Sequence, residues 1–224
     1  MCSANVLEFF IEEVNEDEFK GKRVLEIGSK YVNGSVRSLV EKFLCPKNYV
    51  GVDIESGKFV DLVLDVEDLA NHFGPNTFDV VITTELLEHI CDWRIAIRNM
   101  KEVLKPAGNL YITTRSIGMP FHAYPYDFWR YELDDMKNIF SDFNILSLIK
   151  DSEPPGVFLK CKKPDYWKPT RLEDISLYSM ILGKRTKDIP KSIDMPLMRK
   201  AKFAGYGFGR KLLRLSNSLI KPGI

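Results

Sequence analysis

Lys22-Arg23-Val24-Leu25-Glu26-Ile27-Gly28-Ser29-Lys30-Tyr31-Val32-Asn33-Gly34-Ser35-Val36-Arg37 is the segment from which the fold of this chain can be predicted. It begins as a short run of β-forming apolar residues, breaks at Gly28 into a polar loop, and resumes with apolar residues at helical spacing. This pattern predicts a strand, a loop and a helix, with Ser35 as the helix N-cap. In a doubly wound sheet, such a turn directs backbone N–H groups at the crevice above the strand ends, where an anionic ligand group can bind.

Apolar segments further along the chain extend the same α/β pattern. Residues 78–84 form a nearly continuous apolar run, as expected of a strand buried on both faces of a parallel sheet. The last two strands are joined only by Pro154-Pro155-Gly156, a link too short for a parallel crossover, so we expect them to be antiparallel. The predicted strands are 22–27, 48–54, 59–66, 78–84, 109–114, 143–150 and 156–162, and helices are predicted over 4–14, 36–43, 92–105 and 132–140.

These segments together resemble the class I S-adenosylmethionine-dependent methyltransferases, over roughly residues 20–163. The resemblance implies an α/β fold with a Rossmann-like, doubly wound, seven-stranded sheet in the order 3-2-1-4-5-7-6. The sheet would be parallel except for its last strand, with helices on both faces. It also implies S-adenosyl-L-methionine as the cofactor. The motifs that carry it are Val24-Leu25-Glu26-Ile27-Gly28, Val50-Gly51-Val52-Asp53, Phe78-Asp79-Val80-Val81, Leu86-Leu87-Glu88-His89 and Leu104-Lys105-Pro106-Ala107-Gly108.

The loop after the first predicted strand departs from the usual form of this family. Members usually carry Gly-x-Gly-x-Gly, whereas Lys30 takes the middle position here. The variant Gly-Ser-x-x-x-Asn-Gly-Ser resembles a methyltransferase type 11-like subgroup with a longer loop, in which Gly34 would replace the later glycine. A dinucleotide-binding loop would need Gly-x-Gly-x-x-Gly, which Lys30 and Asn33 both break.

Several side chains become candidates for cofactor binding. Asp53 ends the second predicted strand, where a carboxylate can accept hydrogen bonds from both ribose hydroxyls, although a loop or capping role is the alternative. The resemblance places Asp65 and Val66 near the adenine amino group, while Asp65 is also a plausible turn or cap residue. The cofactor-binding residues that the resemblance implies are Glu26, Gly28, Ser29, Gly34, Asp53, Ile54, Asp65, Val66 and Glu85.

Two histidines are candidate catalytic residues. The resemblance places His89 beside the methionine end of the cofactor, either as a general base or as a residue that positions its loop. His122 lies in residues 121–131, an aromatic and proline-rich segment that follows strand five and is predicted to form a lid over the acceptor. Prolines on both sides of His122 are expected to limit its burial. Tyr124, Asp127 and Arg130 are the candidate substrate residues; Asp127 and Arg130 could pair, or Arg130 could hold an acidic acceptor group.

The composition indicates a soluble cytoplasmic protein and favours no metal site. The four cysteines form no close pairs and are interpreted as thiols of a reducing cytosol. His72, His89 and His122 lie in unrelated segments without ligand spacing, so no metal is predicted. No apolar run approaches the ~20 residues of a membrane span, and the N-terminus lacks the features of a signal peptide.

Charge divides the chain into two predicted parts, a methyltransferase domain at 1–163 and a basic C-terminal extension at 164–224. The extension is expected to be partly helical, with candidate helices at 172–182 and 208–221. Residues 1–163 carry 19 basic and 26 acidic residues, whereas residues 164–224 carry 13 and 5. The second helix would be basic and amphipathic, so it could contact an anionic membrane surface peripherally or pack on the domain with its charges in water.

These observations favour a methyltransferase that modifies an oxygen of a glycan, a lipid-linked sugar or another small acceptor. The glycan class comes from a resemblance of residues 121–131 to methyltransferases often associated with cell-surface glycan genes. A first alternative is an RNA methyltransferase with the basic extension as its phosphate contact, although the catalytic domain is acidic and no Asn-Pro-Pro-Tyr-like motif follows strand four. A second alternative is a non-catalytic nucleotide-binding regulator.

Overall fold

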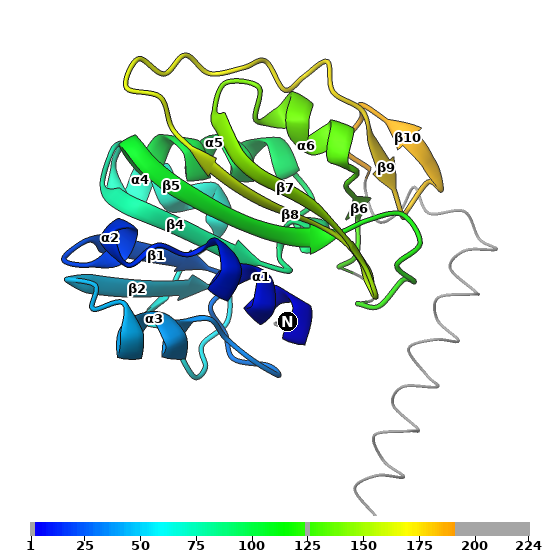
Figure 1. Ribbon diagram of the computed structural model, residues 1–224. Helices are drawn as coiled ribbons and strands as arrows, with labels where there is room; N and C mark the ends of the chain where they lie inside the picture. The colour runs from blue at the N-terminus through cyan, green and yellow to red at the C-terminus, as the bar shows by residue number, and fades with distance from the viewer. Residues whose placement is uncertain (1–2, 124–125, 191–224) are drawn as a thin grey trace, which may run out of the picture.

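A seven-stranded sheet forms the centre of the protein in the computed structural model, which describes residues 3–123 and 126–190 (Figure 1). The strand order is β3-β2-β1-β4-β5-β8-β7. Since β7 and β8 are the sixth and seventh predicted strands, this order confirms the prediction, and β8 runs antiparallel to both of its neighbours. The strands are β1 (Arg23–Ile27), β2 (Asn48–Asp53), β3 (Leu62–Val63), β4 (Phe78–Thr84), β5 (Leu104–Arg115), β7 (Asn144–Ser152) and β8 (Pro155–Lys162).

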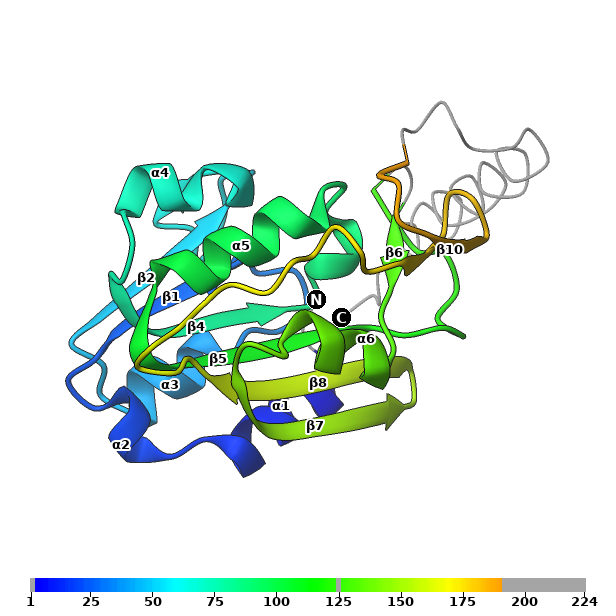
Figure 2. The same cartoon turned by 90° about the horizontal axis from the view of Figure 1, so that it is seen from above.

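Helices cover both faces of the sheet and bury a separate apolar cluster on each (Figure 2). Side chains along a strand point alternately to the two faces of the sheet, so one strand can contribute to both clusters. In β1, Val24 belongs to one cluster, and Leu25 and Ile27 belong to the other. One face carries α1 (Ala4–Glu13), α2 (Glu16–Phe19) and α3 (Arg37–Phe43); the other carries α4 (Leu69–Phe73), α5 (Trp93–Val103) and α6 (Leu133–Ile139). Two short 3-10 helices, η1 (Val66–Asp68) and η2 (Leu87–His89), follow β3 and β4.

A second, three-stranded sheet joins the predicted lid to the C-terminal extension. Its strands are β6 (Trp129–Arg130), β9 (Leu177–Ser179) and β10 (Lys184–Thr186), in the order β10-β9-β6. The prediction of a helix over residues 172–182 is therefore wrong, because β9 pairs with β6 across a long separation that local sequence does not reveal. The side chains of Leu172, Leu177 and Ile181 pack in the same core cluster as α5 and α6, so residues 164–190 pack on the domain.

Two predictions about the extension concern residues that the structure does not describe: the candidate helix at 208–221 and its membrane contact. Within 3–123 and 126–190, none of the helices combines the length and apolar character that a bilayer crossing requires.

Candidate active site

A cavity of about 290 Å³ lies at the carboxyl ends of the parallel strands. Parallel strands bring their carboxyl ends to one edge of the sheet, so the residues that follow β1, β2, β3 and β4 converge there. The walls are largely apolar, with a few carboxylates and one imidazole. The lining residues are Ile27, Gly28, Val52, Asp53, Ile54, Leu64, Asp65, Val66, Glu67, Leu86, His89, Ile90, Cys91, Tyr126 and Phe128.

Gly28 forms part of the cavity wall at the end of β1. Its φ of +77° lies in the left-handed region, and a Cβ atom there would stand 3.1 Å from Leu86 Cδ1. The N–H groups of Gly28 and Ser29 both donate to Val52 O, at 2.9 and 3.0 Å, which ties the loop to β2. The predicted strand-loop turn therefore presents its backbone to the cavity.

Two of the predicted carboxylates lie on the rim of this cavity. Asp53 Oδ2 accepts from Lys30 N at 3.1 Å and Oδ1 accepts from Glu55 N at 3.1 Å, so the carboxylate is held in place. Its remaining lone pairs can accept ribose hydroxyls. Asp65 Oδ1 accepts from Glu67 N at 2.9 Å, which makes Asp65 the cap of η1 as well as a lining residue.

Four predicted cofactor residues do not line the cavity: Glu26, Ser29, Gly34 and Glu85. Glu26 is buried and accepts a hydrogen bond from Tyr49 Oη at 2.9 Å, and burial raises its pKa to about 7. Gly34 lies in the loop before α3, where Ser35 Oγ accepts from Arg37 N at 3.0 Å. The prediction of Ser35 as the N-cap is wrong: Val36 occupies that position, because the helix begins one residue later than expected, at Arg37. The cofactor contacts of these four residues stay predictions.

A buried group of charged residues lies beneath the loop after β4. Glu85 adopts φ +55°, donates its N–H to Thr113 O at 2.8 Å, and forms an ion pair with Arg115. Burial, followed by the charge of Glu88, raises the pKa of Glu85 to about 8. A positive φ in a non-glycine residue is strained, and such strain often accompanies a functional loop.

The two predicted catalytic histidines contact each other at one end of the cavity. The rings of His89 and His122 meet edge to face, with centroids 4.9 Å apart. His89 lines the cavity, and its Nδ1 lies 2.6 Å from the backbone oxygen of Tyr126. The fold therefore brings together two histidines from the loop after β4 and from the predicted lid.

His122 is held by Asp127, and its side chain is more buried than the neighbouring prolines suggested. Its Nδ1 lies 3.1 Å from Asp127 Oδ2, and its backbone N–H donates to the same oxygen at 2.9 Å. The residue as a whole is half-buried, as the flanking prolines suggested, but only 5% of its side chain is exposed. The carboxylate of Asp127, itself buried, draws the imidazole inward.

The guanidinium group of Arg130 is bound within the protein interior and does not face a methyl acceptor. It pairs with Asp127 as predicted, with Nη1 2.5 Å from Oδ1 and Nη2 2.9 Å from Oδ2. Its guanidinium also donates to the backbone oxygens of Met119, Pro120 and Trp129. All five N–H donors of the side chain thus have partners, which leaves none for an acidic acceptor group. Burial would raise the pKa of Asp127, but Arg130 and His122 together lower it to about 2.

Tyr124, the remaining predicted substrate residue, lies outside the described residues. In contrast, Tyr126 and Phe128 of the same segment line the cavity, and sequence reasoning missed them as individual contacts. It also missed Glu88, which is fully buried and accepts a hydrogen bond from Thr114 Oγ1 at 2.9 Å. The sequence could have indicated these residues only by their positions: Glu88 follows β4, and Tyr126 and Phe128 lie in the aromatic segment.

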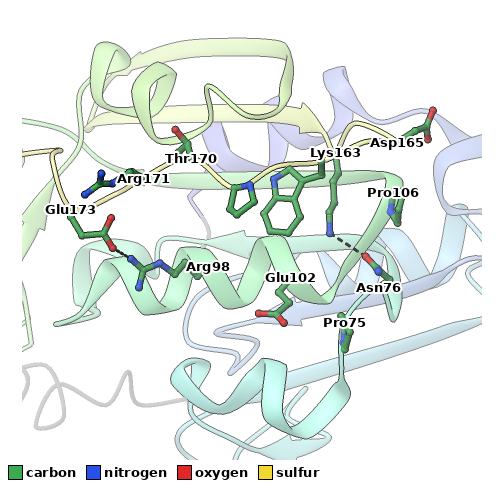
Figure 3. A pocket seen from close by; sticks show the side chains of 12 residues that line it. Pro75, Asn76, Arg98, Glu102, Pro106, Lys163, Asp165, Thr170, Arg171 and Glu173 are labelled. Atoms are coloured by element: carbon green, nitrogen blue, oxygen red, sulfur yellow. Dashed lines mark hydrogen bonds and ion pairs between the residues drawn. The ribbon is translucent and has the colours of Figure 1, made fainter.

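A larger hollow of about 660 Å³ lies elsewhere, between α5 and the chain that follows β8 (Figure 3). The residues that precede β4 line it, so it lies toward the amino ends of the parallel strands. Two of the cationic side chains that line it already have partners: Arg98 pairs with Glu173, and Lys163 donates to Asn76 Oδ1 at 3.1 Å. It lacks the glycine loop and the strand-end carboxylate, so the cavity near His89 is the candidate active site.

Comparisons with known proteins show the family of this chain. A family model described as a methyltransferase domain matches residues 2–151. A ubiquinone biosynthesis O-methyltransferase from Xanthomonas euvesicatoria pv. vesicatoria (strain 85-10) is 45% identical over 62 residues, which are 27% of this chain and 26% of that protein. The chain therefore matches about a quarter of the length of this curated relative.

Two solved structures share the fold at low sequence identity. An S-adenosylmethionine-dependent methyltransferase from Mesorhizobium loti superposes with a TM-score of 0.55 at 15% identity, covering 72% of this chain and 98% of that one. Phosphoethanolamine N-methyltransferase 2 from Haemonchus contortus, solved in complex with S-adenosyl-L-methionine, has a TM-score of 0.54 at 16% identity, covering 72% and 53%.

Proposed function

This chain belongs to the methyltransferase-domain family, and from that premise we propose that it methylates a hydroxyl oxygen of a small acceptor, such as a glycan sugar or a lipid-linked sugar. The broader activity is that of an S-adenosylmethionine-dependent methyltransferase of class I. The acceptor class is the proposed part, because O- and N-methyltransferases both occur among its relatives.

The cavity suits the cofactor of this family. When bound, S-adenosyl-L-methionine supplies a methyl group on a positively charged sulfur. Gly28 would allow the ligand to approach the β1 loop closely, and the Asp53 carboxylate would hold hydroxyl groups at the tip of β2. Asp65 and Val66 would bound the far wall, with the apolar side chains of Leu64 and Ile90 beside them.

The contact between His89 and His122 is the observation that best supports an oxygen atom as the methyl acceptor. A hydroxyl group must lose its proton as its oxygen attacks the methyl carbon, and an imidazole near neutral pKa can accept that proton. His89 lines the cavity, while Asp127 orients the ring of His122 through Nδ1. The aromatic residues Tyr126 and Phe128 complete an apolar wall against which a sugar ring or a lipid-linked group could pack. Alignment of the two reactants would supply much of the rate enhancement.

Methyl transfer to fractionated acceptor pools tests this proposal. The full chain is incubated with cofactor carrying a labelled methyl group, together with free glycans, lipid-linked sugars or RNA. We expect label in a sugar fraction, and we expect NMR to place the new methyl group on oxygen. Label confined to RNA would favour the nucleic-acid alternative, and a methyl group on nitrogen would overturn the oxygen assignment.

We also propose that the enzyme works in the cytoplasm, with its basic extension near the inner face of the membrane. The excess of basic residues in 164–224 and the thiol state of Cys45, Cys91 and Cys161 support this location.

A further inference from the structure

Glu88, His89 and His122 converge beside the cofactor cavity, although the spacing of the histidines along the chain predicted no metal site. One ligand atom from each of these residues lies within 4.8 Å of the other two. His89 also lines the cavity, so this cluster adjoins the space where methyl transfer would occur. Histidine spacing along the chain did not predict this arrangement, because His122 enters from the lid.

Glu88 supplies an oxygen that needs a positive partner. The residue is fully buried, and within the described residues its Oε1 has no hydrogen-bond partner. Leaving a carboxylate oxygen buried without a partner is unfavourable. The nearest cationic candidate, His89 Nε2, lies 3.7 Å from Oε1, which is too long for a hydrogen bond.

The orientation of His89 indicates which kind of group could lie between its Nε2 atom and Glu88 Oε1. Its Nδ1 lies 2.6 Å from Tyr126 O, an acceptor, so Nδ1 carries a proton and the neutral ring presents a lone pair at Nε2. A lone pair and a carboxylate oxygen then face each other across 3.7 Å. That distance is close to the roughly 3.4 Å between two ligands of a tetrahedral ion with bonds of about 2.1 Å.

Each member of the cluster also has the outer partner that a metal ligand usually has. Glu88 Oε2 accepts from Thr114 Oγ1 at 2.9 Å, and His89 donates to the backbone of Tyr126. His122 Nδ1 lies 3.1 Å from Asp127 Oδ2. Such contacts fix the orientation and tautomer of ligating side chains, and they are a regular feature of metal sites in proteins.

We propose that Glu88, His89 and His122 bind one divalent transition-metal ion of the zinc type beside the cofactor cavity. Two imidazole nitrogens and one carboxylate oxygen suit zinc or cobalt better than magnesium, which prefers oxygen ligands. Three protein ligands leave a coordination position open, as in catalytic rather than structural zinc sites.

The open position suggests a role at the acceptor, and this part rests on the proposed oxygen methylation. A hydroxyl oxygen held by the ion would lose its proton more readily, and that proton would pass to water. The oxygen–carbon bond would form as the sulfur–carbon bond of the cofactor breaks, and the neutral thioether would leave. The ion would then perform the task otherwise assigned to a histidine base.

Metal binding can be measured without any acceptor. The full chain, with its affinity tag removed and stripped by a chelator, is titrated with Zn²⁺ and with Co²⁺. We expect one ion per chain, with a Co²⁺ absorption spectrum typical of four- or five-coordination. Glu88→Gln keeps the shape of the side chain but should weaken binding by roughly 100-fold or more, and His122→Asn should do the same.

The third histidine provides a matched control. His72 is exposed on α4, so His72→Ala should bind zinc as the unaltered protein does. Retained cofactor binding in Glu88→Gln would show that this variant is folded. Equal zinc affinity in Glu88→Gln and the unaltered chain would overturn the site, as would a preference for Mg²⁺.

The two proposals fail in different ways. If zinc binds but no oxygen acceptor is methylated, the site stands and the proposed acceptor class falls. If methyl transfer to oxygen is found but zinc does not bind, the transfer stands and a histidine base remains. If both hold, adding Zn²⁺ back to stripped enzyme should restore turnover in the unaltered chain and leave Glu88→Gln at its low rate.

Discussion

At the scale of single residues, the candidate site depends on a few positions that the fold holds in unusual environments. Gly28 needs a left-handed backbone against Leu86, and Glu26 is a carboxyl group buried in the sheet. His122 is fixed by the buried pair of Asp127 and Arg130. Each of these environments leads to a measurable expectation.

Gly28→Val should abolish binding of S-adenosyl-L-methionine, because a branched side chain would enter the space between the loop and the ligand. The strained φ should also destabilise the protein by about 1–3 kcal/mol. Gly74 has a similar φ of +75° but nothing within 4 Å of its Cβ position, so Gly74→Val is a matched control for strain. Calorimetry should show normal cofactor binding for Gly74→Val, and equal loss in both variants would contradict the assignment.

His122→Ala should lower turnover by roughly 10²–10⁴, the range of a general base, while cofactor affinity is kept. The same loss is expected if the residue holds a metal ion, and the zinc titration separates the two roles. Full turnover in this variant would reduce His122 to a structural residue of the lid and leave His89 as the candidate base.

Glu26 should make the protein less stable as pH rises from about 4.5 through 7. Burial raises its folded pKa from 4.5 to about 7, so the unfolded chain releases the proton first and gains relative stability over that interval. The loss should approach about 3 kcal/mol above pH 7. Urea unfolding between pH 4.5 and 7 should show this loss of unfolding free energy in the unaltered chain and not in Glu26→Gln. Glu12→Gln, on the exposed side of α1, is the control; an unchanged pH profile in Glu26→Gln would contradict the expectation.

At the scale of elements, the three-stranded sheet attaches the first part of the C-terminal extension to the lid. Strand β9 pairs with β6, and Met180 N donates to Phe128 O at 2.8 Å, next to a residue that lines the cavity. The first part of the extension is thus hydrogen-bonded to the lid segment. Strand β6 in turn ends at Arg130, whose guanidinium fixes the loop that carries His122.

Leu177→Ala should test this attachment. Leu177 is fully buried in β9, so its truncation should destabilise the protein by about 2–5 kcal/mol in a single unfolding transition. Leu146→Ala, at a half-exposed position of β7, should change stability by no more than about 0.5 kcal/mol. A separate low-temperature transition in Leu177→Ala would instead indicate that residues 164–190 unfold on their own.

At the scale of the whole molecule, charge is distributed unevenly, with a basic excess in residues 164–224. We expect residues 191–224 to bind anionic vesicles, with each basic residue near the surface contributing about 1 kcal/mol. Salt should weaken this binding. Truncation after Pro190 keeps every described element and should abolish vesicle sedimentation, and changing Arg210, Lys211 and Arg214 to glutamate should weaken it in the full chain. Equal sedimentation after truncation would refute the expectation, and RNA binding in its place would favour the nucleic-acid alternative.

The strand order, the glycine loop after β1 and the acidic end of β2 could all be predicted from the amino-acid sequence. These features follow from local periodicity and from a family resemblance, both of which can be read along the chain. Local pattern also predicted the aromatic segment over the cavity, because prolines and aromatic residues cluster in it.

The contacts among those residues, in contrast, became apparent in the folded protein alone. The pairing of β6 with β9 overrode the apparent helical character of residues 172–182, because a strand gains its hydrogen bonds from a partner far away in the chain. In the protein interior, every N–H donor of the Arg130 side chain has a partner. The contact of Glu88 and His89 with His122 joins the loop after β4 to the lid, and no spacing rule connects such distant segments. The physical reason is common to all three: long-range contacts depend on how the packed elements close around one core, and local sequence does not specify that closure.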